Sequence, residues 1–163
     1  MKLPVVLIGQ DNIALVSLRQ QIEKEHAFLV EGKVIGFEDA FEILQQKKGP
    51  ILAVVDLSRD PERAFLTAEE IKSKISNIHL LMTSPDKNPE TILRAMRLGA
   101  EEFLTQPFHW PEVLRSLEGI QAKVDIQSTK PVEEGRTIAV FSNKGGVGST
   151  TVATNLAATL AAK

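Results

Sequence analysis

The segment Ile51-Leu52-Ala53-Val54-Val55-Asp56 decides the fold, because five consecutive apolar residues end on a single carboxylate. Continuous apolar runs of this length are typical of strands that are covered on both faces, as in a parallel sheet. Val5–Ile8 and Ile78–Met82 have the same character, and Phe28–Ile35 and Phe103–Leu104 are weaker candidates. The sequence therefore predicts five strands.

Helical spacing fills the intervals between these strands. Apolar residues recur three or four positions apart at Leu15–Ile22, Phe41–Leu44, Ile92–Met96 and Val113–Ile120. Gly99 follows the helix around Ile92 as a C-terminal glycine, and Pro111 lies near the start of the last helix. Right-handed crossovers then predict an α/β domain over residues 1–122, a doubly wound parallel sheet with the order 2-1-3-4-5.

The pattern changes after residue 122. Residues 123–136 are polar and aperiodic, which indicates a linker or a helix extension. Ile138–Phe141 then reads as another buried strand, which leads through a glycine loop into an Ala/Leu-rich helix. A lone strand–loop–helix cannot build a core. Residues 137–163 are therefore expected to be the first unit of a longer domain, and their apolar surface predicts a homodimer contact.

Composition narrows the function classes. The formal charge is −2 and there is no cysteine, so the sequence predicts neither nucleic-acid binding nor disulfides. No apolar run reaches the ~18 residues of a membrane span, and the first residues do not resemble a signal peptide. The expectation is a cytoplasmic protein. His26, His79 and His109 lack metal-ligand spacing, and Phe108 and Trp110 are expected in the core and at a helix start.

Polar residues follow three of the predicted strands. Asp11, Asp56 and Ser84 fall at the carboxyl ends, where doubly wound folds collect their chemistry. Two facing carboxylates favour a hard cation such as Mg²⁺, and an aspartate beside it can accept a phosphoryl group that a hydroxyl senses. The alternative is structural: Asp56 caps a strand end, Asp11 or Asn12 caps a helix, and Ser84 is a turn residue before Pro85.

Residues 3–122 resemble the response-regulator receiver family, most clearly in LGAEEFLTQPF at Leu98–Phe108. The resemblance implies that Asp56 is the phosphoacceptor, Asp11 one member of the acidic pair, Ser84 the hydroxyl and Phe103 the aromatic switch residue. It also implies a cis bond between Gln106 and Pro107.

Two positions depart from the receiver family. Gln10 stands at the other acidic position and Gln106 replaces the lysine. Mg²⁺ binding at Asp11 and Asp56 is therefore expected to be weak or absent, and no cation engages a phosphorylated Asp56.

The glycine loop after Phe141 reads NKGGVGSTT. Its glycines aim backbone N–H groups inward, and Thr150 can offer a hydroxyl to Mg²⁺. Compared with the standard phosphate loop, Asn143 replaces a glycine and Ser149 replaces the lysine. The segment is similar to the deviant Walker loop of MinD/ParA ATPases, which implies nucleotide contacts from Lys144, Gly145, Gly146, Gly148, Ser149, Thr150 and Thr151. The alternative is a glycine-rich turn before an alanine-rich helix.

The combination of a receiver-like domain with this loop resembles the CpaE/TadZ family of pilus-assembly proteins. That resemblance implies a non-enzymatic assembly and localisation module, found at a cell pole, with pilus or secretion proteins as partners. It implies ATP binding, and at most weak hydrolysis, only in the intact protein, with no cofactor held tightly by these 163 residues. The alternative is a working receiver that a histidine kinase phosphorylates on Asp56 and that regulates an attached ATPase.

Overall fold

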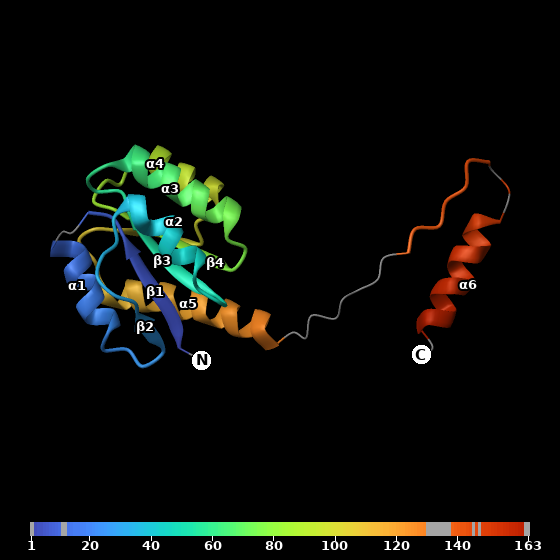
Figure 1. The fold of residues 1–163 in the computed structure, drawn as a ribbon, viewed down its shortest axis with the longest axis horizontal. Coiled ribbons are helices and arrows are strands. Elements are labelled where there is room, and N and C mark those ends of the chain that lie inside the picture. The colour runs from blue at the N-terminus through green and yellow to red at the C-terminus, as the bar shows by residue number, and fades with distance from the viewer. Residues whose placement is uncertain (1, 11–12, 130–137, 145, 147, 162–163) are drawn as a thin grey trace. The chain divides into compact units, whose positions relative to one another are not determined.

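The computed structural model describes residues 2–10, 13–129, 138–144, 146 and 148–161, without the side chains of residues 128–129. The chain divides into two units, Met1–Thr129 and Lys130–Lys163. Within these described residues, the first unit has five strands and five helices and the second has one helix (Figure 1). No described helix is both long enough and apolar enough to cross a membrane.

Strands and helices alternate through the first unit. The elements are β1 (Leu3–Ile8), α1 (Ile13–Ile22), β2 (Phe28–Val30), α2 (Phe37–Gln45), β3 (Ile51–Asp56), α3 (Pro61–Lys74), β4 (Ile78–Ser84), α4 (Pro89–Leu98), β5 (Glu102–Thr105) and α5 (Trp110–Thr129). All paired strands are parallel, in the order β2-β1-β3-β4-β5. The predicted topology is therefore confirmed.

Alternate residues of each central strand pack on opposite faces of the sheet. In β3, Ala53 and Val55 join the apolar layer beneath α2 and α3, whereas Leu52 and Val54 join the layer formed with α1 and α5. Figure 1 shows α1 and α5 on one side of the sheet and α2–α4 on the other. Because both faces are covered, these strands read as unbroken apolar runs.

Two element boundaries differ from the sequence prediction. Strand β2 ends at Val30, and only an isolated bridge between Ile35 and Ile8 continues the predicted pairing toward residue 35. Helix α5 continues through Thr129, so the first part of residues 123–136, predicted as a linker or a helix extension, is a helix extension. Val124 is 2% exposed and packs in the core beside Ile120, so the helix still has an apolar contact to make in that region.

Three local predictions are confirmed. Gly99 ends α4 with φ of 98°, a left-handed conformation that costs glycine little. Trp110 begins α5, and Phe108 packs against the apolar layer beneath that helix. The bond between Gln106 and Pro107 is cis.

The second unit confirms one of its two predicted elements. Helix α6 spans Ser149–Ala161, where the helix after the glycine loop is expected. Ile138–Phe141, predicted as a strand, forms none in the described part of this unit, and Phe141 is 88% exposed. A strand needs a partner for its backbone N–H and C=O groups, and the described residues of this unit provide none.

Candidate functional site

Asp56 is the last residue of β3 and lies at the carboxyl edge of the sheet, the edge where doubly wound folds place their sites. The strand register sets it beside Thr83 of β4, and Ile8 of β1 pairs with the preceding Val55. Asp56 is 1% exposed and Thr83 is fully buried. A buried carboxylate must be satisfied by hydrogen bonds.

Ser58 and Gln106 both donate hydrogen bonds to Asp56. Oδ1 of Asp56 accepts from the Ser58 hydroxyl at 2.6 Å, from the Ser58 backbone N–H at 3.3 Å and from Nε2 of Gln106 at 2.8 Å. Nε2 of Gln106 also lies 3.3 Å from Oγ1 of Thr83. Asp56, Ser58, Thr83 and Gln106 are named the Asp56 cluster below. Gln106, which stands where the receiver family has a lysine, thus contacts Asp56 with a neutral amide in place of a cation.

Gly9 follows β1 and approaches Asp56 closely. A Cβ built on Gly9 would lie 3.0 Å from Cβ and 3.7 Å from Oδ2 of Asp56. It would also lie 3.3 Å from Cδ1 of Leu15. Carbon atoms normally stay about 3.5–4.0 Å apart. Position 9, directly after β1, therefore accommodates a glycine and leaves no room for an acidic side chain without displacing Asp56.

Ser84 and Phe103 occupy supporting positions. Ser84 ends β4, is 3% exposed, and its Oγ accepts the backbone N–H of Asp86 at 3.0 Å. The Ser84 carbonyl accepts the Gln106 N–H at 2.9 Å, which joins the β4 and β5 ends beside Asp56. Phe103 of β5 is half-buried and packs on the apolar layer beneath α2 and α3.

The predicted acidic pair falls only partly within the described residues. Gln10 is exposed, and Asp11, like its rival cap Asn12, lies outside the described residues. Among the described residues, no three carboxylate or histidine side chains form a group able to hold a metal ion. Oδ1 of Asp56 is already engaged by three hydrogen bonds. The described part of this cluster does not fit a Mg²⁺ site.

Sequence reasoning missed Ser58, Thr83 and Gly9. Ser58 had a signal, because an aspartate followed two residues later by serine is a common turn in which the carboxylate accepts the backbone N–H. The sequence signals for Thr83 and Gly9 were weaker than the signal for Ser58. Their roles depend on the register of β4 and β1 against β3, which fixes the neighbours of Asp56.

The glycine loop keeps part of its expected geometry. Gly146 and Gly148 have φ of 81° and 82°, and α6 begins at Ser149. The Ser142 hydroxyl donates to the Lys144 carbonyl at 2.9 Å and lies 3.4 Å from the Ser149 hydroxyl. Gly145 lies outside the described residues. Thr150 and Thr151 stand in the first turn of α6.

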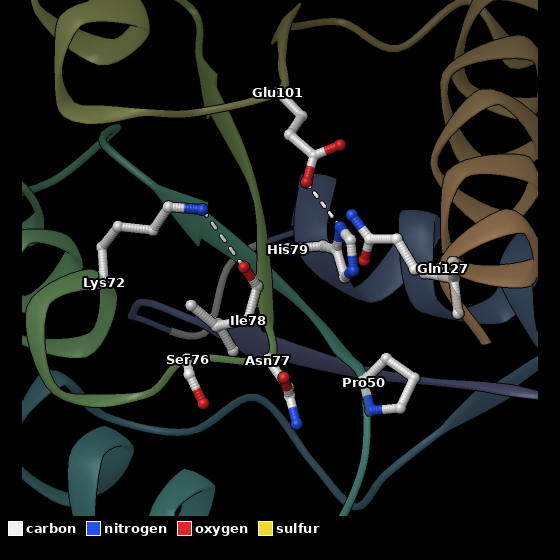
Figure 2. Close-up of a pocket in the computed structure, with 9 residues that line it drawn as sticks. Pro50, Lys72, Ser76, Asn77, Ile78, His79, Glu101 and Gln127 are labelled. Atoms are coloured by element: carbon white, nitrogen blue, oxygen red, sulfur yellow. Dashed lines mark hydrogen bonds and ion pairs between the residues drawn. The ribbon is translucent and has the colours of Figure 1, made fainter. Parts of the chain in front are cut away.

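A polar hollow of about 310 Å³ lies at the opposite edge of the sheet, where β3 and β4 begin (Figure 2). Lys72 donates to the Ile78 carbonyl at 3.2 Å, and His79 contacts Glu101 at 2.5 Å, which in turn binds Lys123 at 3.0 Å. Burial raises the pKa of Glu101, but hydrogen bonds from Lys123 and His79 outweigh it and hold that pKa below its ordinary value. These contacts tie α3, β4, β5 and α5 together, so the hollow is best explained structurally.

Known proteins resemble the first unit. No family model matches the chain. It is 24% identical to the response regulator protein GraR of Staphylococcus haemolyticus over 122 residues, 74% of this chain and 52% of that protein. It is 26% identical to the sensory transduction protein BceR of Bacillus subtilis over 100 residues, 60% of this chain and 43% of that protein. The chain thus spans about half the length of these curated relatives.

Solved structures agree on the fold. A response regulator from Thermotoga maritima superposes with a TM-score of 0.65 at 20% identity, covering 75% of this chain and 99% of that one. A CheY-like receiver domain protein from Methanospirillum hungatei gives 0.65 at 15% identity, covering 78% and 99%. With the strand order and the helices on both faces, these matches show that the first unit has the fold of a CheY-like response receiver domain.

Proposed function

We propose that the first unit is the receiver module of a phosphorelay signalling protein, with Asp56 as its phosphoryl acceptor. The observation that carries this proposal is the place of Asp56, which ends the central strand β3 at the carboxyl edge, between β1 and β4 and in contact with Gln106. The names of the curated relatives, response regulator and sensory transduction protein, support the same function.

The bonds that change in the transfer belong to the carboxylate and to a phosphorylated donor. An oxygen of Asp56 attacks phosphorus, the bond between phosphorus and the donor breaks, and its electron pair leaves with the donor group. For acetyl phosphate the leaving group is acetate. A serine hydroxyl carries a donor proton beside its acceptor lone pairs, so Ser84 can hydrogen-bond to an oxygen of the transferred group. A histidine kinase is the corresponding protein donor.

The test is phosphoryl transfer from acetyl phosphate to the 163-residue chain, followed by intact-protein mass spectrometry. The expected result is one phosphoryl group per chain, absent from Asp56→Asn. Asp86→Asn is the matched control, because Asp86 is exposed and belongs to the turn after β4. The proposal is contradicted if no variant that keeps Asp56 takes up a phosphoryl group from excess donor.

A second function is favoured by one observation, the neutral amide of Gln106 in place of a cation at Asp56. In this case the module works by protein contact without phosphoryl transfer, and it is attached to a MinD/ParA-like domain that begins at residue 137, as in pilus-assembly proteins of the CpaE/TadZ type. ATP binding, a homodimer and a polar location belong to this proposal. Nucleotide binding by the full-length protein, together with no phosphoryl uptake, would favour it over the first.

A further inference from the structure

Three hydrogen bonds at Asp56 fall on the same carboxylate oxygen, Oδ1. Oδ1 accepts the Ser58 hydroxyl, the Ser58 backbone N–H and the Gln106 amide, all within 3.3 Å. The two side chains also meet each other, because Oγ of Ser58 lies 3.3 Å from Oε1 of Gln106. Carboxylate, hydroxyl and amide therefore form a closed ring that bridges the ends of β3 and β5.

We propose that Ser58 and Gln106 act as a clamp on Asp56, one that restrains the carboxylate and slows its phosphorylation. The inference rests on the proposed function and adds its regulation. The clamp is defined by the hydrogen bonds that both residues donate to Oδ1. Breaking these hydrogen bonds then precedes phosphoryl transfer and regulates its rate.

The direction of the effect follows from where the charge moves. Hydrogen bonds to a carboxylate are strong because the acceptor carries charge. When Oδ2 attacks phosphorus, Oδ1 becomes the carbonyl oxygen of an acyl phosphate and loses charge, so its hydrogen bonds weaken along the reaction. Contacts that are stronger in the ground state than in the transition state raise the barrier. Attack through Oδ1 requires the same contacts to break first.

A structural role for Ser58 predicts a different result. If the serine only fixed the turn after β3, its removal would leave the rate unchanged or lower it through lost positioning. The clamp predicts a faster reaction. Part of the hydrogen bond survives in the transition state, so the expected gain for Ser58→Ala is on the order of threefold to tenfold.

The experiment compares initial rates of phosphoryl uptake from acetyl phosphate in the 163-residue chain. Ser58→Ala removes the hydroxyl, Ser58→Thr retains it, and Ser76→Ala makes the control substitution at the hollow on the opposite edge. We expect only Ser58→Ala to react faster. A second readout is hydrogen exchange of the Gln106 side-chain amide, identified by its loss in Gln106→Leu. Exchange should accelerate on the order of tenfold in Asp56→Asn, which lacks the charged acceptor.

Each outcome decides between the two proposals. Faster uptake in Ser58→Ala supports the clamp, whether the unaltered chain reacts slowly or not at all. An unaltered chain that reacts while Ser58→Ala is equal or slower overturns the clamp and leaves the proposed function standing. If no variant takes up a phosphoryl group, the proposed function is refuted. The clamp is then refuted as well, because removing Ser58 from it does not make Asp56 reactive. A Gln106 amide whose exchange does not respond to Asp56→Asn overturns the clamp by itself.

Discussion

Replacing Gly9 with alanine adds one methyl group at the tightest point of the carboxyl edge. The new Cβ would stand 3.0 Å from Cβ of Asp56 and 3.3 Å from Cδ1 of Leu15. To reach ordinary contact, Cβ of Asp56 must retreat by about 0.5 Å or more and Cδ1 of Leu15 by about 0.2 Å or more. The leucine can shift at its far end, but Cβ of Asp56 is fixed to the central strand.

Overpacking of this kind costs about 1–3 kcal/mol. For a unit of this size each kcal/mol lowers the melting temperature by roughly 4 °C. We therefore expect Gly9→Ala to melt about 4–12 °C lower, a loss that urea unfolding should match through a lower midpoint at unchanged slope. The displaced Asp56 also loosens its bond to Gln106, so exchange of the Gln106 side-chain amide should quicken.

Gly119→Ala supplies the matched control. Gly119 lies within α5, and a Cβ built there meets no atom within 4 Å. The same substitution should stabilise the chain there by about 0.5–1 kcal/mol, because alanine favours the helix. If Gly9→Ala is as stable as the unaltered chain while Gly119→Ala behaves as expected, the close approach of β1 to Asp56 is wrong.

Three further predictions concern the charged and polar groups. The pKa of Glu101 is lower in the folded state than in the unfolded state, so its carboxylate stabilises the fold above the unfolded pKa and loses this effect as the pH falls. The difference in melting temperature between the unaltered chain and Glu101→Gln should therefore narrow from about pH 5 to pH 3 in thermal scans. Gln106→Lys should raise the steady-state phosphorylated fraction with acetyl phosphate roughly fivefold, because an ammonium binds phosphoryl oxygens more strongly than an amide. An unchanged fraction by mass spectrometry would mean that a cation at position 106 does not stabilise the phosphorylated state. In the full-length protein, Ser149→Lys should tighten ATP binding on the order of tenfold, measured by equilibrium dialysis. Unchanged affinity would mean that Lys144 and the backbone N–H groups already bind the phosphates without a lysine at position 149.

The sheet could be predicted from the sequence because burial on both faces leaves a direct trace. Leu52 and Val54 face one layer and Ala53 and Val55 the other, so the strand reads as one apolar run. The end of α5 could not be predicted, because Val124 is a single apolar residue in a polar stretch. Its burial depends on where the preceding helical turns already lie.

The site could be predicted only in part. Asp56 follows from the end of its strand, and the contact between Gln106 and Asp56 follows from the receiver resemblance. The closed ring with Ser58 depends on side-chain rotamers, and the exclusion of a side chain at position 9 depends on the spacing of β1 and β3. The strand expected at Ile138–Phe141 depends on a partner, which hydrophobicity alone does not reveal.

The most direct test of the central claim is the mass of the 163-residue chain after incubation with excess acetyl phosphate in a buffer that contains Mg²⁺. The receiver function predicts one added phosphoryl group in the unaltered chain and in the control Asp86→Asn, and none in Asp56→Asn. The claim is contradicted if the unaltered chain and Ser58→Ala both remain unmodified, or if Asp56→Asn takes up the group as readily as the unaltered chain.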